Sequence, residues 1–268
     1  MLGTSSIVLD AVIIVGISVA ISMAVLWTIR WAIPHERLTP HNEVSGFVYA
    51  VIGVIYAIIL GFAVITVWEH YNEAKSDAHA EANAVANIYR IASGLPEPSR
   101  GEIQDASLAY VSTVAEKEWA AMDDGTAPVQ QAVDDINTLW SSFDSVALTT
   151  SAEEALYAEG LNQLSELSSL RRERLEDNDA ALLGIMWGVV VGGAILTVLF
   201  PCLFGVESRL VHSLIIGTLA ASIGLLLLLT YDLNYPFNGD VAIGPGAFER
   251  VLEQFSAEGQ SAFVGFLR

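Results

Sequence analysis

The chain has 268 residues, of which 53% are hydrophobic and 16% are charged, and its net charge is −19. Because soluble domains carry about 25% charged residues, this composition argues against a purely soluble protein. The shortage of Lys and Arg argues against nucleic-acid binding, which depends on displacing phosphate counterions. The one cysteine, Cys202, excludes a disulfide within the chain and a paired-cysteine metal site.

Four apolar segments reach the roughly 20 residues that a membrane-spanning helix requires. They cover residues 7–33, 45–68, 181–205 and 210–231. In the first, Trp27 and Trp31 suit the aromatic belt at a membrane interface. No Lys or Arg precedes this segment and it exceeds the length of a signal-peptide core, so we do not expect it to be a cleaved signal.

Residues 69–180, between the second and third spans, predict an acidic helical domain. They contain 22 acidic and seven basic residues and so carry −15 of the net −19. Their richness in Ala, Glu, Leu and Gln, with breakers between, predicts helices over 69–93, 99–123, 128–147 and 151–179. Thr150 or Ser151, followed by Glu153 and Glu154, is typical of a helix start.

The first and last of these helices have no Gly or Pro separating them from the membrane. We therefore expect the span 2 and span 3 helices to extend unbroken into the soluble domain. Leu161, Leu164, Leu167 and Leu170 recur at helical spacing and predict a core for that domain. The predicted fold is an all-α integral membrane protein, with four transmembrane helices and a helical soluble domain inserted between spans 2 and 3.

The chain therefore divides into four regions. Residues 1–68 hold transmembrane helices 1 and 2, residues 69–180 the acidic domain, residues 181–231 transmembrane helices 3 and 4, and residues 232–268 an elbow and a C-terminal tail. An even number of spans places both termini and the acidic domain on one side of the membrane. Basic residues near the helix ends do not decide which side, whereas the missing signal peptide favours the cytoplasm.

The second span carries five small residues at intervals of four, three, four and four, which form one helix face. Small residues allow helices to pack closely, and they also leave room along a pore. Tyr49 and Tyr56 form a second stripe that suits either interhelical hydrogen bonds or polar rungs of a conduction path. Glu43 would form a carboxylate ring at one mouth of a symmetric oligomer. The pore-lining candidates are Glu43, Gly46, Tyr49, Ala50, Gly53, Tyr56, Ala57 and Gly61.

Beyond the span, Glu69, Glu73, Asp77 and Glu81 follow at intervals of four. Like charges at this spacing destabilise a helix by roughly 0.2–0.5 kcal/mol per pair. The series therefore indicates either a solvated face or a vestibule that attracts cations. Carboxylate oxygens also suit a hard divalent ion, but no metal-ligand spacing is recognisable, so the metal stays unknown.

The third span contains Gly184, Gly188 and Gly192, a spacing typical of close helix packing. Pro201 is expected to kink or end this helix.

Residues 231–245 turn abruptly from apolar to polar. Pro and Asn-Gly supply turn chemistry, so we expect a structured elbow that docks the tail on the helical domain. Its Asp and Asn side chains are expected to reach water, protein amides or Arg171 to Arg174. Residues 244–255 predict an amphipathic helix with Phe248, Leu252 and Phe255 on one face. The elbow residues are Asp232, Asn234, Pro236, Asn238, Gly239 and Asp240. Without a Ser–His pair, an HExxH motif or a glycine-rich phosphate loop, we expect neither enzyme activity, catalytic residues nor a cofactor.

Three stretches resemble the bestrophin-like family of bacterial four-span membrane proteins: NEVSGFVYAVIGVIYAIILGFAV (42–64), WEHYNEA (68–74) and YDLNYPFNGDVAIGPGAFERVL (231–252). Bestrophins are pentameric anion channels with a cytosolic helical domain. The resemblance therefore implies a multi-pass plasma membrane protein of a prokaryote, a homo-oligomer (a pentamer), and membrane lipids and inorganic ions as partners.

We accordingly expect a homo-oligomeric ion channel with a pore lined by transmembrane helix 2 and an acidic cytosolic vestibule. The acidic vestibule favours cations, whereas the resemblance implies anions, so ion selectivity stays open. The alternative is a non-conducting membrane sensor or scaffold whose helical domain recruits a partner.

Overall fold

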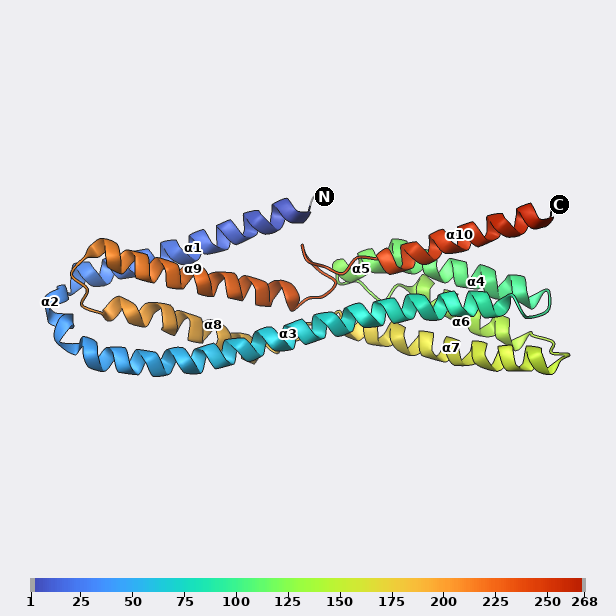
Figure 1. Cartoon of the computed structure of the whole chain (residues 1–268), viewed down its shortest axis with the longest axis horizontal. Helices are drawn as coiled ribbons and strands as arrows, with labels where there is room; N and C mark the ends of the chain where they lie inside the picture. Colours follow the sequence, from blue (N-terminus) through green and yellow to red (C-terminus); the bar gives the residue numbers. More distant parts are fainter. Residues whose placement is uncertain (1–2, 267–268) are drawn as a thin grey trace. The chain divides into compact units, whose positions relative to one another are not determined.

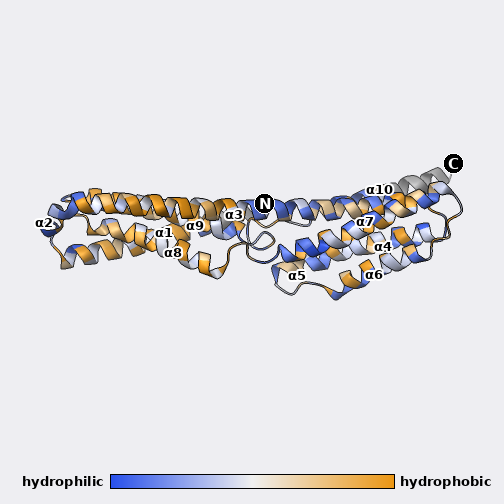
Figure 2. Cartoon of the chain, turned by 90° about the horizontal axis from the view of Figure 1, so that it is seen from below, coloured by the Kyte–Doolittle hydropathy of each residue, from blue (hydrophilic) through white to orange (hydrophobic). Residues whose placement is uncertain are grey.

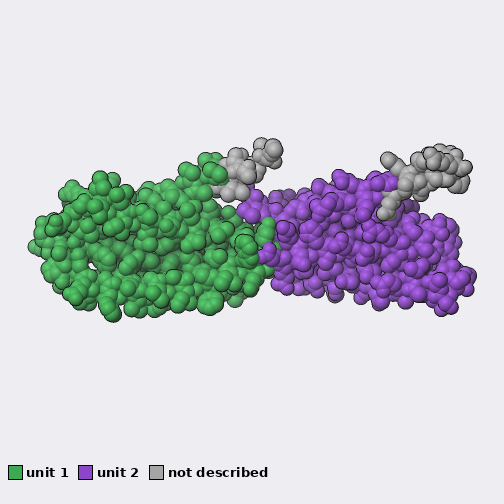
Figure 3. All heavy atoms as spheres, viewed as in Figure 1, with its two compact units in different colours: residues 1–71, 180–235 green, residues 72–179, 236–268 purple. Residues whose placement is uncertain are grey.

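The structure, a computed structural model, describes residues 3–266, and it describes side chains from residue 8 to residue 257. Helices, turns and loops account for all described residues, with no strand among them. The chain divides into two compact units (Figure 3). Unit 1 contains residues 1–71 and 180–235, and unit 2 contains residues 72–179 and 236–268.

Within the described residues, four helices are long and apolar enough to cross a membrane: α1 (Gly3–Ala32), α3 (Asn42–Ala92), α8 (Gly184–Leu199) and α9 (Arg209–Leu233). Figure 2 shows the hydrophobic colouring concentrated on α1, α8, α9 and the first half of α3. The predicted all-α fold with four apolar spans is confirmed.

Unit 1 is a bundle of α1, α8, α9 and the part of α3 up to Tyr71 (Figure 1). α1 packs along α9, and α8 contacts both. Tyr56 and Val67 of α3 share an apolar cluster with Val190 of α8 and Ile223 of α9. The short α2 (His35–Leu38) and η1 (Thr39–His41) connect α1 to α3. α8 ends at Leu199 and the 3-10 turn η3 (Phe200–Leu203) follows, in agreement with the break predicted at Pro201.

Unit 2 combines the second half of α3 with α4 (Ser99–Thr113), the π-helical turn η2 (Val114–Glu118), α5 (Trp119–Asp123), α6 (Gln130–Asp144), α7 (Ser151–Glu176) and α10 (Gly246–Phe266). The predicted start of α7 is confirmed. Thr150 accepts a hydrogen bond from the backbone N–H of Glu153, and the Glu153 carboxylate accepts one from the N–H of Thr150 in return. Leu164 and Leu167 are fully buried, so the predicted leucine face does form core.

The two predicted extensions of the spans turn out differently. α3 is one helix of 51 residues, as expected for span 2. The prediction of an equally unbroken helix through span 3 is wrong, because α7 ends at Glu176 and α8 begins at Gly184. Within unit 1, the backbone N–H of Leu182 donates to Oδ1 of Asn234 (2.8 Å) and that of Ala181 to the Asn234 carbonyl (3.3 Å). Since these amides bond to Asn234 and not to a preceding helical carbonyl, the helix is interrupted here.

Candidate pore face and buried ion-pair network

The small residues of α3 are left uncovered by the described part of the chain. A Cβ atom built on Gly46, Gly53 or Gly61 would meet no atom within 4 Å. Ala50 and Ala57 are exposed. The stripe therefore does not serve helix packing within the described chain, and its face is free for a pore, lipid or another subunit. Glu43, at the start of the helix, is exposed as well.

Tyr49 and Tyr56 point away from this face, into their own unit. The Tyr49 ring stacks on Phe200, with ring centroids 5.9 Å apart. Tyr56 is 5% exposed, and a Cβ on Gly193 of α8 would lie 2.5 Å from its ring. The Tyr56 hydroxyl has no hydrogen-bond partner among the described residues, so the interhelical hydrogen bond considered for it is not formed. The eight pore-lining candidates therefore do not share one face.

The glycine face of α8 is likewise uncovered. Gly184, Gly188 and Gly192 are exposed, and a Cβ on any of them would meet nothing within 4 Å. The glycine that permits close packing inside the unit is the neighbouring Gly193, against which the Tyr56 ring lies. The predicted packing face is thus unoccupied within the described chain.

The acidic series separates into two environments. Glu69 and Glu73 are exposed, and Asp77 is half-buried. Burial, followed by the charges of Glu173 and Glu73, raises the pKa of Asp77. Glu81 is fully buried, so the prediction that it belongs to a solvent-facing vestibule is wrong. No group of three or more His, Cys, Asp or Glu side chains in the described residues could hold a metal ion.

Glu81 instead belongs to a buried ion-pair network in unit 2. Arg174, wholly buried, donates from Nε to Glu81 (2.6 Å) and from Nη2 to Glu118 (2.7 Å). Arg171 donates to both oxygens of Glu118, at 2.5 and 3.3 Å. The Tyr110 hydroxyl donates to Oε1 of Glu81, which also accepts a hydrogen bond from Nη2 of Arg174 (3.1 Å). Two carboxylates thus face two guanidinium groups, and the buried charges balance.

Burial and charge set the ionisation of the network. Burial, with the Glu81 charge, raises the pKa of Tyr110 well above its ordinary value and keeps the phenol neutral. Burial opposes ionisation of Glu118, but Arg174 and Arg171 outweigh it and lower its pKa. Burial likewise opposes the charge on Arg174, yet Glu81 more than compensates and raises the pKa of Arg174. The stability that ionised Glu118 contributes is therefore present above its ordinary pKa of 4.5, and it is lost as pH falls through the lowered value.

The local sequence explains how these side chains meet. Arg171 and Arg174 continue the core face of Leu164, Leu167 and Leu170 at helical spacing on α7. Glu118 closes the π-helical turn η2, whose wider turn shifts the register of the side chains that follow α4. The sequence signal for a buried ion-pair network is the position of two arginines on the same helix face as the buried leucines. The spacing of the leucines alone does not reveal the network.

An aromatic wall covers the network. The Cζ atom of Arg174 lies 5.2 Å from the ring centroid of Trp119 and 5.9 Å from that of Phe248. The Trp119 indole N–H donates to the carbonyl of Ile243 (2.8 Å), which ties the segment before α10 to this site. Phe255, further along α10, stacks on Tyr89 with centroids 3.9 Å apart. The predicted docking of the tail on the helical domain is confirmed.

The elbow residues take separate roles. In unit 1, Asn234 is buried and bonds the backbone before α8, while Asp232 is half-buried. In unit 2, the carbonyl of Pro236 accepts from the N–H of Ile243 (2.8 Å). Gly239 has φ +85°, a turn conformation that favours glycine.

Two further elbow residues lie in unit 2. The side-chain amide of Asn238 faces the Met122 carbonyl at 3.1 Å, and Asp240 is exposed. The sequence offered the elbow side chains water, protein amides or Arg171 to Arg174 as partners, and Asn234 takes protein amides. Arg171 and Arg174 bind buried glutamates, and Arg172 donates to Ser169.

Comparisons with known proteins match this architecture. Residues 16–248 match the family model of the bestrophin-like domain. Two crystal structures of single-substitution variants of a bacterial bestrophin homologue from Klebsiella pneumoniae align over 92% of this chain and 98–99% of theirs, with TM-scores of 0.67 and 0.68 and 13% identity. A structure described as a membrane protein aligns with a TM-score of 0.68 at 12% identity, over 92% of this chain and 97% of that one. No curated protein matches the sequence significantly. With the family model covering most of its length, the chain belongs to the bestrophin-like family.

Proposed function

We propose that the protein is the subunit of a homo-oligomeric ion channel whose pore is lined by the small-residue face of α3. The observation that carries this proposal is the uncovered stripe formed by Gly46, Ala50, Gly53, Ala57 and Gly61. A stripe of small residues that packs against nothing in its own chain leaves space beside the helix, and a symmetric ring of such helices would enclose that space. Membership of the bestrophin-like family supports the same function.

The subunit has further apolar surface for neighbours and lipid. Around α3, large side chains are exposed next to the small stripe, among them Phe47 at 80% and Phe62 at 66%. The exposed glycines of α8 offer a second surface for close helix contact. We assign these surfaces to other copies of the chain and to membrane lipids, with five copies implied by the family. The soluble unit and both termini are assigned to the cytoplasm.

The exposed carboxylates and the family membership predict opposite ion selectivities. Glu43 is exposed at the start of α3, and Glu69 and Glu73 are exposed just beyond the apolar part of the same helix, which favours cations at both mouths. The family favours anions. Reversal potentials of the purified protein in planar bilayers under a KCl gradient would separate the two. Neutralising Glu69 and Glu73 together should shift the reversal potential if these carboxylates line the ion path.

Cysteine accessibility tests the pore face itself. In a Cys202→Ala background, Gly53→Cys places a thiol on the small face. Ile55→Cys places one about 200° around the same helix at nearly the same depth, on a side chain that is 54% exposed. Charged methanethiosulfonate reagents should alter the current through Gly53→Cys and leave Ile55→Cys unaffected. A change in current through Ile55→Cys alone would indicate that the small face contacts lipid. Absence of any current through the unmodified protein in all salts tested would favour the non-conducting sensor.

A further inference from the structure

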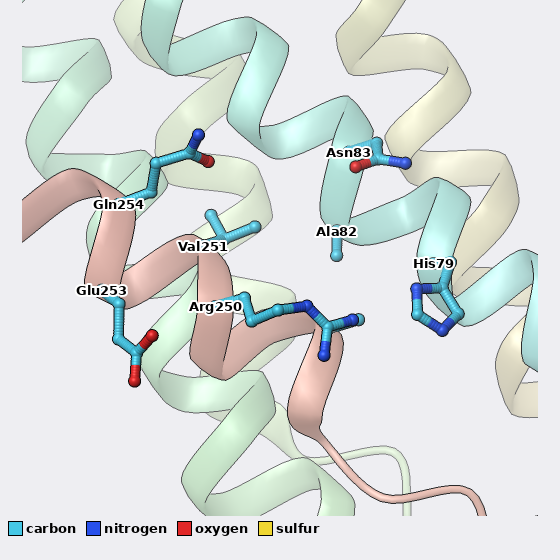
Figure 4. Close-up of a pocket in the computed structure, with 8 residues that line it drawn as sticks. His79, Ala82, Asn83, Arg250, Val251, Glu253 and Gln254 are labelled. Atoms are coloured by element: carbon cyan, nitrogen blue, oxygen red, sulfur yellow. The ribbon is translucent and has the colours of Figure 1, made fainter.

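We propose that unit 2 binds a small organic oxyanion, a carboxylate or phosphate ester with a compact apolar body, in the groove between α3 and α10 (Figure 4). The groove has a volume of about 540 Å³. Small-molecule sites typically measure about 300–1,000 Å³, so a ligand of modest size fits. Both walls belong to unit 2, and the site goes beyond conduction because its residues lie outside the apolar first part of α3 and outside α1, α8 and α9.

The cationic part of the groove comes from Arg250 and His79. In Figure 4 the Arg250 side chain extends from α10 towards the His79 ring on α3. Arg250 forms no ion pair with any side chain that the structure describes, in contrast to Arg171 and Arg174 of the same unit. Glu253, the acidic residue in the lining, points away from the Arg250 guanidinium in Figure 4. A free guanidinium beside an imidazole presents the planar set of donors that binds carboxylate or phosphate oxygens in pairs.

The rest of the lining indicates the body of the ligand. Ala82, Ala247 and Val251 are buried and give the groove an apolar floor. Asn83 and Gln254 add neutral hydrogen-bond donors from the two helices. Five of the eight lining residues are polar or charged, so polar contacts dominate and the apolar floor adds contact with the body of the ligand. An anion with an apolar body therefore gains contacts here that chloride or inorganic phosphate does not.

The charge of the surrounding domain makes the prediction specific. Residues 69–180, which include most of unit 2, carry a net −15, so long-range electrostatics repel anions from this unit. Saturable binding of an anion must therefore come from a local site that overcomes this repulsion. Arg250 supplies a guanidinium to the groove between α3 and α10.

Calorimetric titration of the full-length protein in detergent tests the proposal. The probes are phenyl phosphate and benzoate, compared with inorganic phosphate and chloride at matched ionic strength. Phenyl phosphate and benzoate should bind more tightly than inorganic phosphate and chloride. Arg250→Gln should weaken binding by about tenfold or more, because it removes the charge-assisted hydrogen bonds. Arg250→Lys, which keeps the charge without the planar fork, should fall between, and His79→Gln should cause a smaller loss.

Arg172→Gln is the matched control, since Arg172 is an exposed arginine of the same unit outside the groove. It should bind the probes like the unaltered protein. Equal binding by Arg250→Gln, an equal loss in Arg172→Gln, or probes that bind no better than chloride would overturn the proposal. Circular dichroism of Arg250→Gln verifies that unit 2 remains folded. The readout is heat of binding and not current, so the result is independent of whether the protein conducts.

Discussion

Replacing Arg174 by Met should destabilise unit 2 far more than any change at its surface. Arg174 and its two carboxylate partners, Glu81 and Glu118, have side chains with no exposed area. Removing one partner of a buried pair costs about 3–5 kcal/mol, because a buried charge is left uncompensated. Glu118 keeps Arg171, whereas Glu81 keeps only the hydroxyl of Tyr110, so Glu81 accounts for most of the loss.

Hydrogen exchange measured by mass spectrometry on the full-length protein gives this loss locally. A loss of 3–5 kcal/mol lowers the protection of amides in α4 and α7 between about one hundredfold and several thousandfold. Peptides from α1 and α9 serve as an internal reference, and their protection should not change. Arg172→Met is the matched control, because Arg172 is exposed and bonds only to Ser169 among the contacts described; it should cost at most about 0.5 kcal/mol.

The double variant Glu81→Gln/Arg174→Met isolates the electrostatic cause. It removes both charges, and the amide oxygen of the introduced glutamine can still accept the hydrogen bond from Tyr110. Much of the lost protection should return, since a buried pair can be replaced by neutral residues at little cost. If the double variant is as unstable as Arg174→Met alone, or if Arg174→Met is as protected as the control, the network does not stabilise unit 2 through its charges.

Three further changes have predicted outcomes. Asp77→Asn should raise the thermal stability of unit 2 at pH 7, because folding raises the pKa of Asp77 and the ionised carboxylate therefore destabilises the folded state. The gain should vanish as pH falls below the ordinary pKa of about 3.8, where Asp77 is protonated in both the folded and the unfolded state. Gly193→Ala should destabilise unit 1 by about 1–3 kcal/mol and so lower the melting temperature in detergent, because the added Cβ would clash with the Tyr56 ring. Gly192→Ala is the control and should leave the melting temperature unchanged, because its Cβ would meet no atom within 4 Å. Thr150→Ala should cost about 1 kcal/mol in denaturant unfolding, because the first turn of α7 loses its cap, and an unchanged midpoint would contradict that role.

Much of the fold could be predicted from local patterns. Apolar length identified the four spans, and the absence of Gly and Pro after residue 68 identified the continuation of α3. The interruption before α8 could not be predicted in the same way. It depends on Asn234, more than fifty residues further along the chain, which takes the hydrogen bonds of Leu182 and Ala181. Such long-range competition for backbone amides leaves no local trace in the sequence.

The candidate site was predicted less completely, for a related reason. Periodicity placed Gly46, Gly53 and Gly61 on one face but could not tell whether that face is covered. The interval of four residues also grouped Glu81 with acidic residues that are exposed to solvent, because the sequence does not show which of these side chains is buried. Arg174, from a helix more than ninety residues away, is what makes burial of Glu81 tolerable. Partners of this kind become visible only when the helices are brought together.

An electron cryomicroscopy reconstruction of the full-length protein in lipid nanodiscs tests the central claim most directly. The account predicts a symmetric ring of subunits in which Gly53 and Ala57 of every α3 face a central opening. A monomer, or a ring in which these residues face lipid while Phe62 faces the axis, would contradict it.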